Sequence, residues 1–171
     1  MEYVTAAGFL ALILALGAVE MDLRSRRIAN VWLAAGWAAG FWIQLSPGGR
    51  GAAAFAAGSL LPLALLAVLF WFRMLGAGDI KLLSALGGLM GASAVLQCIF
   101  WSFLFGAVFS IGILSACGSW SQRLSYFFHY IKEYLTTKTR VPYRRGNEGA
   151  ECLHFSVPVL MGTLLWIGGF Y

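Results

Sequence analysis

Charged side chains are scarce in this sequence. Of its 171 residues only 11% are Asp, Glu, Lys or Arg, whereas 60% are hydrophobic, and the mean hydropathy is +0.79. Soluble domains carry about 25% charged and about 45–50% apolar residues. The composition therefore excludes an ordinary water-soluble globule, a disordered chain and a nucleic-acid-binding domain. The net charge of +5 is better explained by cations gathered at a membrane face.

Cysteine is also sparse, and its spacing excludes paired metal or redox motifs. The three cysteines, Cys98, Cys117 and Cys152, form no C-x-x-C pair, and the first two lie in apolar runs. We interpret them as small hydrophobic residues without a disulfide or a zinc site. The first apolar run lacks a preceding basic region and a following A-x-A cleavage site. It is therefore expected to be a retained helix rather than a signal peptide.

Long apolar segments predict an all-α membrane bundle of about six transmembrane helices. A spanning helix needs about 20 apolar residues, and somewhat fewer can suffice. The predicted spans are residues 3–19, 30–45, 52–72, two short helices within 80–117, and 154–170. The two short helices are divided at the turn expected at Gly91-Ala92-Ser93. Small residues four apart, such as Gly36 and Gly40, predict close packing between helices.

Basic residues predict the orientation of this bundle. All but Arg50 of the 12 Lys and Arg residues follow the first, third and fifth predicted helices. By the positive-inside rule these loops face the cytoplasm and both chain ends face outward. Anionic lipid heads are then the expected partners of these cations. We expect one membrane-embedded domain over residues 1–171, in which 118–153 forms a long cytoplasmic loop with an interfacial helix.

Two acidic residues lie at helix ends on the predicted cytoplasmic face. Asp22 closes the first helix and Asp79 opens the fourth. An ionisable group close to hydrocarbon is costly, so each is a functional candidate. Two carboxylates held close share a proton, so one can act as a base on water while the other polarises a carbonyl group. Such a pair can hydrolyse a peptide without a metal or a nucleophilic side chain.

Each acid also has a structural interpretation. Asp79 can cap the helix that it opens, and Asp22 can be an incidental acid beside the basic cluster at 24–27. Asn30 is expected to cap the helix over 30–45. These residues alone leave the catalytic and the structural interpretation open.

The surroundings of the acids supply further candidate site residues. Gly76 and Gly78 are expected to adopt backbone conformations forbidden to other residues and to leave room for a substrate strand. Lys81 and Arg26 are candidates to tune the acids or to bind a substrate carboxylate, with interfacial anchoring as the alternative. Two histidines are interpreted as interfacial polar residues rather than catalysts: His129 and His154.

Two motifs resemble those of the type IV prepilin peptidase family. The stretch from Asp22 to Asn30 is similar to the family's D-x-x-x-x-x-I-P-N pattern, with Ala29 in place of the proline. The stretch 76–82 matches the G-x-G-D-x-K-L pattern throughout, and residues 155–158 with Gly162 are similar to the last-helix motif. The resemblance implies a membrane aspartic peptidase whose catalytic pair is Asp22 and Asp79.

The resemblance also implies a substrate and a compartment. Longer family members carry two C-x-x-C pairs linked to N-methylation, and this chain lacks them, so it resembles the short, peptidase-only branch. We expect an enzyme of a prokaryotic cytoplasmic membrane that removes a short basic leader from a prepilin-like protein, without a metal or a cofactor. The alternatives are a non-catalytic subunit of a pilus or secretion apparatus, and an archaellin-type or other G-x-G-D peptidase. A small transporter is disfavoured because the sequence shows no internal repeat.

Overall fold

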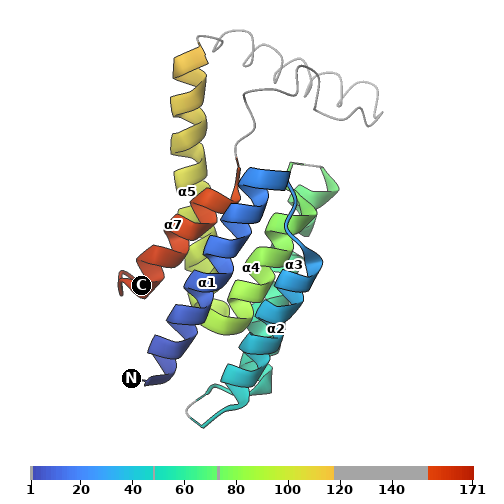
Figure 1. Cartoon of the computed structure of the whole chain (residues 1–171), viewed down its shortest axis with the longest axis vertical. Helices are drawn as coiled ribbons and strands as arrows, with labels where there is room; N and C mark the ends of the chain where they lie inside the picture. The colour runs from blue at the N-terminus through green and yellow to red at the C-terminus, as the bar shows by residue number, and fades with distance from the viewer. Residues whose placement is uncertain (1, 48, 73, 118–153) are drawn as a thin grey trace. The chain divides into compact units, whose positions relative to one another are not determined.

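The described part of the chain is entirely helical. The computed structural model describes residues 2–47, 49–72, 74–117 and 154–171 (Figure 1). These residues form six α-helices and no strand. The helices are α1 (Glu2–Ser25), α2 (Asn30–Leu45), α3 (Ala52–Trp71), α4 (Ala77–Met90), α5 (Ala92–Cys117) and α7 (Ser156–Ile167). The predicted fold class is confirmed, and the predicted bounds of the second helix are those of α2.

The helices differ in whether they can cross a membrane unaided. Three are long and apolar enough: Ala6–Ser25, Ala52–Trp71 and Ala92–Ile113. α7 is apolar but shorter, and α2 and α4 have 16 and 14 residues. At about 1.5 Å per residue α4 is about 21 Å long, less than the hydrocarbon core of about 30 Å. Full-length spans therefore accompany shorter helices in this membrane bundle. The interfacial helix predicted within 118–153 lies outside the described residues, as does His129.

Helix α4 is the centre of the unit that carries both acids. The chain divides into two compact units, residues 1–106 with 154–171 and residues 107–153. In the first unit α4 packs against α1, α2 and α3, and α1 also packs against α2 and α7 (Figure 1). All residues from 82 to 91 are buried. The apolar character of α4 on all sides is therefore explained by protein neighbours.

Small residues let the backbones of α2, α3 and α4 approach closely. A Cβ atom on Gly58 would overlap the carbonyl oxygen of Gly87. A Cβ on Gly40 would lie 3.0 Å from the carbonyl carbon of Gly88. The close packing predicted from small residues four apart is thus confirmed at the contacts of α4 with α2 and α3.

The C-terminal end of α4 is closed by a turn and by polar side chains. Gly91 separates α4 from α5 with a φ of +88°, a left-handed value that favours glycine, so the predicted break is confirmed. The Gln44 amide donates to the Gly88 carbonyl at 3.1 Å, and the Arg50 guanidinium donates to the Met90 carbonyl at 3.1 Å. Carbonyls that a helix end leaves without an intrahelical partner are thereby satisfied, and the cation also suits the negative end of the helix dipole.

Candidate active site

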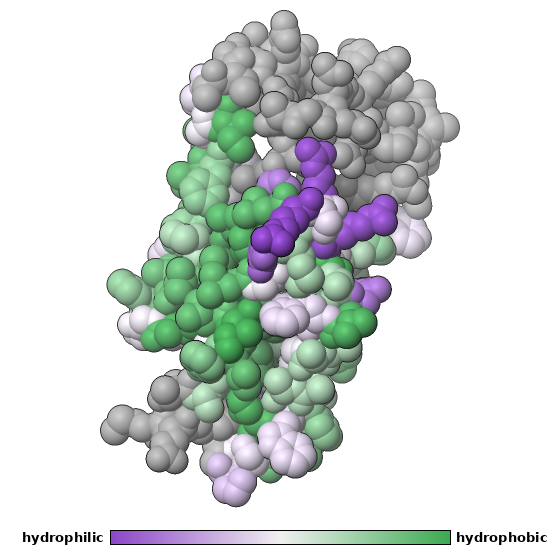
Figure 2. All heavy atoms as spheres, in the orientation of Figure 1, coloured by the Kyte–Doolittle hydropathy of each residue, from purple (hydrophilic) through white to green (hydrophobic). Residues whose placement is uncertain are grey.

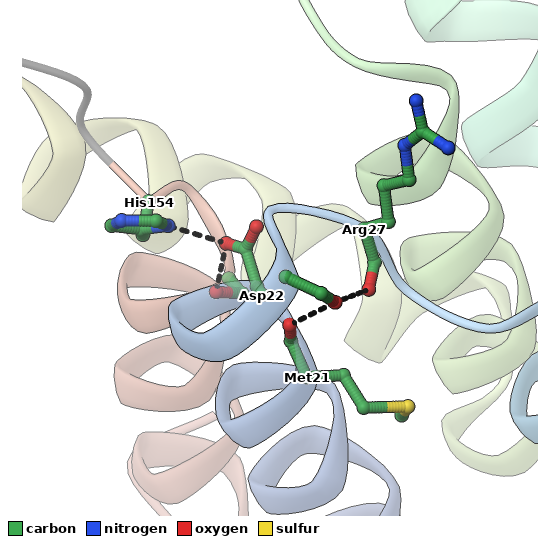
Figure 3. Close-up of polar contacts among 6 residues, drawn as sticks. Met21, Asp22, Arg27 and His154 are labelled. Carbon is green, nitrogen blue, oxygen red and sulfur yellow. Dashed lines mark hydrogen bonds and ion pairs between the residues drawn. The ribbon is translucent and has the colours of Figure 1, made fainter. Parts of the chain in front are cut away.

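Asp22 lies in the last turn of α1, where Arg26 ends the helix. Arg26 has a φ of +54° and is the one non-glycine residue with a positive φ in the described ranges. Its N–H donates to the backbone carbonyl of Asp22 at 2.8 Å, which is the left-handed helix termination that usually employs glycine. The Ser25 hydroxyl lies 2.8 Å from the Met21 carbonyl oxygen and 3.0 Å from that of Arg27 (Figure 3). The chain therefore turns sharply directly after Asp22.

Asp79 is the third residue of α4 and caps that helix. The helix begins after Gly76, which has φ −72° and ψ 145°. The Gly76 N–H donates a hydrogen bond to the Asp79 carboxylate, as the third-position acid does in a capping box. A Cβ on Gly76 would lie 3.0 Å from Asp79 Oδ2. The N-cap position expected for Asp79 is therefore occupied by Gly76, and the Asp79 carboxylate lies in the first turn of the helix.

The predicted backbone role of the two motif glycines is wrong. Gly76 has an extended conformation that any residue can adopt, and Gly78 lies inside α4. Among the described glycines, positive φ values occur elsewhere, at Gly51, Gly91 and Gly169. Space rather than backbone freedom explains Gly76, because its missing Cβ allows the Asp79 carboxylate to lie against it. At Gly78 an added Cβ would meet Ile28 at an ordinary contact distance of 3.7 Å.

Asn30 joins the two motif segments instead of capping α2. The residue before α2, Ala29, makes no side-chain cap hydrogen bond, and Asn30 is already the first helical residue. Its Oδ1 accepts a hydrogen bond from Lys81 Nζ at 3.1 Å. The predicted cap role of Asn30 is therefore wrong, and Lys81 is engaged by α2. The side chain of Ile28 beside Gly78 adds an apolar contact between the same two segments.

Asp22 receives two polar contacts from the start of α7. Ser156 Oγ donates to Asp22 Oδ2 at 2.6 Å, and His154 Nδ1 lies 3.3 Å from the same oxygen (Figure 3). His154, interpreted from the sequence as an interfacial polar residue rather than a catalyst, also contacts Asp22, because α1 packs against α7. The available signal was a polar His-x-Ser pair at the start of an otherwise apolar helix.

The two carboxylates interact electrostatically. Burial first, and the negative charge of Asp22 second, raise the pKa of Asp79 from 3.8 to about 6. The hydrogen bond from the Gly76 N–H and the positive charge of His154 lower the pKa of Asp79. Asp79 lies outside the three candidate spans. It therefore keeps its proton to an unusually high pH, which is the property that the acid of a carboxylate pair needs.

Exposed polar groups surround this end of the first unit. Figure 2 shows hydrophilic side chains gathered near the end of α1, beside a mostly apolar surface. Glu20 and Arg24 form an ion pair at 3.0 Å that is largely exposed and contributes little to stability. Within the described ranges, no group of three or more His, Cys, Asp or Glu side chains is placed to hold a metal ion. The chemistry available here is that of two carboxylates with a hydroxyl and an imidazole.

Comparison with known proteins supplies a family for this arrangement. No curated protein and no solved structure matches the chain. The family model of the type IV leader peptidases matches residues 8–111, which is more than half of the chain and includes both Asp22 and Asp79. The chain therefore belongs to the type IV leader peptidase family, and its activity is that of a peptidase.

Proposed function

We propose that this peptidase is an aspartic endopeptidase with Asp22 and Asp79 as its catalytic pair, and that it removes the leader of a prepilin-like protein. The observation that carries the proposal is the convergence of two acids from the ends of different helices. The charge of Asp22 acts on Asp79, and neighbouring residues tie α1, α2 and α4 together at this point. Membership of the leader peptidase family supplies the reaction class.

The proposed reaction uses one ionised and one protonated carboxyl group. Asp22 takes a proton from water while the water oxygen bonds to the scissile carbonyl carbon, and Asp79 gives its proton to the carbonyl oxygen. When the neutral tetrahedral intermediate collapses, the C–N bond breaks and the leaving nitrogen takes the proton from Asp22. Asp79 recovers its proton from the hydroxyl that becomes the new carbonyl. Each turnover consumes one water and restores both acids.

The surroundings of the acids fit a substrate anchored in the bilayer. Gly76 and Ala77 are exposed beside Asp79, so an extended peptide can approach the carboxylate. Arg24, Arg26 and Arg27 lie at the same end of α1 as Asp22. By the positive-inside rule this end faces the cytoplasm of a prokaryotic inner membrane, with both chain ends outside. A short basic leader that ends in glycine ahead of an apolar helix presents its scissile bond at this depth.

Substitution of the acids tests the proposal. In cells that also express a candidate prepilin, Asp22→Asn and Asp79→Asn are each expected to lower leader removal by at least about 1,000-fold while the protein still inserts. Glu20→Gln is the matched control, because it changes an exposed acid of the same helix and should retain cleavage. Full processing by either Asp variant would remove that acid from the mechanism. Chelators should leave the rate unchanged, and a loss restored by metal would contradict the two-acid scheme.

The capping contact of Asp79 favours one alternative. A non-catalytic subunit of a pilus or secretion apparatus would need the acids only as structural caps, as the Gly76 hydrogen bond allows. In that case the variant with both Asp→Asn substitutions would still support assembly of the apparatus. Loss of assembly together with accumulation of uncut prepilin supports the peptidase instead.

A further inference from the structure

Asp22 is held through one of its two carboxylate oxygens. The contacts from Ser156 and His154 both fall on Oδ2, and neither involves Oδ1 (Figure 3). An ionised carboxylate only accepts hydrogen bonds, so the Ser156 hydroxyl is the donor, and the protonated His154 imidazole forms an ion pair with the same oxygen. The distance of 2.6 Å from Ser156 Oγ is typical of a hydroxyl bound to a charged carboxylate.

Ser156 is held firmly where it meets Asp22. Ser156 is fully buried (0% exposed) and is the first residue of α7, so packing fixes its hydroxyl. The Asp22 carboxylate thereby lies at the N-terminal end of α7, where the helix dipole favours a negative charge. His154 lies two residues before the start of α7, and its imidazole makes the second contact with Asp22 Oδ2. Both side-chain contacts therefore hold the Asp22 carboxylate through the same oxygen.

We propose that Ser156 and His154 are positioning residues that hold the Asp22 carboxylate through Oδ2 and leave Oδ1 to take the proton from water. Asp22 is then the base of the pair, and Asp79 is the acid. The inference rests on the proposed function and adds to it two residues that position the carboxylate proposed as the base. The two acids differ in what binds them. Asp22 is contacted by side chains at and just before the start of α7, whereas Asp79 is bound by the Gly76 backbone at the start of its own helix.

Three other charged side chains from α1 and α4 have partners of their own. On α1, Glu20 is paired with Arg24 at the exposed surface. On α4, Lys81 binds Asn30 of α2. From the α7 side, the charged group that faces Asp22 is His154. A substitution at His154 therefore changes the charge close to both acids, and its effect on each can be measured separately.

The test uses the full-length protein in membranes and a reporter whose short basic leader ends in glycine before an apolar segment. Ser156→Ala is expected to lower kcat about 10-fold without changing KM, because the base loses a charge-assisted hydrogen bond. Ser102→Ala is the matched control. Ser102 is also fully buried and donates to a carbonyl of its own helix, Cys98, at 2.6 Å. This control should leave kcat and KM unchanged.

Two substitutions at His154 distinguish the loss of its contact with Asp22 from the loss of its positive charge. His154→Phe removes both and should lower kcat about threefold, whereas His154→Asn restores a donor near the Nδ1 position and should recover most of that loss. Both variants remove a charge that lowers the pKa of Asp79, so both should move the alkaline limb of the pH profile of kcat/KM to higher pH. His154 is partly exposed (24%), which keeps this arm available if Ser156→Ala fails to fold.

The outcomes distinguish this inference from the proposed function. A variant lacking both Ser156 and His154 side-chain donors that keeps the parental kcat and an unmoved alkaline limb overturns the inference. The inference is also overturned if the activity of this variant falls only in proportion to a lower melting temperature. In either case, inactive Asp22→Asn and Asp79→Asn variants would leave the proposed function standing. Full cleavage by those Asp variants would overturn the proposed function itself.

Discussion

The two ends of α4 are built in different ways. At the C-terminal end, Gln44 and Arg50 reach in from outside the helix to bind its last carbonyls, and the surrounding residues are buried. At the N-terminal end the cap comes from Asp79 of the helix itself, beside an exposed Gly76. One end is therefore closed by packing and side-chain hydrogen bonds, whereas the other leaves a carboxylate within reach of a substrate. The contrast predicts that stability is concentrated at the closed part of α4 and reactivity at its open end.

The largest expected effect tests the closed part. Gly58→Ala should destabilise the protein by about 3 kcal/mol, because the new Cβ would overlap the Gly87 carbonyl and force α3 away from α4. Thermal unfolding in detergent measures this change. Gly8→Ala is the control, since a Cβ there would meet Ile167 at an ordinary 3.6 Å. Equal melting temperatures for the two variants would show that the close approach of α3 and α4 does not stabilise the bundle.

A smaller effect is expected at the open end, on rate rather than stability. Gly76→Ala should lower kcat about 10-fold, because its Cβ would lie 3.0 Å from Asp79 Oδ2 and displace that carboxylate. The backbone angles at Gly76 suit alanine, so the free energy of unfolding should change by less than about 1 kcal/mol. Gly78→Ala is the matched comparison and should have the smaller effect on kcat. A larger loss from Gly78→Ala would reverse the roles assigned to the two glycines.

The smallest predicted effect concerns pH. Since the pKa of Asp79 is raised to about 6, the protonated acid is lost above that value, and kcat/KM should fall about fivefold between pH 6 and pH 7. The same shift has a consequence for stability. Between pH 3.8 and about 6 the folded protein holds a proton that the unfolded chain has released, so stability falls as pH rises through this window. A pH–rate profile that is flat from pH 6 to pH 8 would contradict the assignment of Asp79 as the acid.

Much of the helical frame was predictable because its signals are local. The bounds of α2 follow from one apolar run, and the break before α5 follows from a glycine that adopts a left-handed conformation. The two acids became site candidates because each stands beside a recognisable motif at the end of a predicted helix. These features depend on residues close together in the sequence, so packing between helices did not alter them.

The missed features depend on contacts between distant parts of the chain. Ser156 and Asp22 are separated by 134 positions, and Lys81 and Asn30 by 51. No local pattern predicts that α7 packs against α1. Nor does one predict that Lys81 of α4 donates a hydrogen bond to the Asn30 side chain, which was expected to cap α2. The conformational argument for Gly76 failed for a related reason. The need for glycine there arises from the volume of the Asp79 carboxylate and not from the backbone.

The hydrogen bond from Ser156 to Asp22 links α7 to α1. Translation delivers about 5–20 residues per second, so the 75 positions from Asp79 to His154 occupy about 4–15 s. During that interval a nascent chain carries both carboxylates without the brace that α7 provides. The contact between Ser156 and Asp22 can therefore form only after α7 has been synthesised.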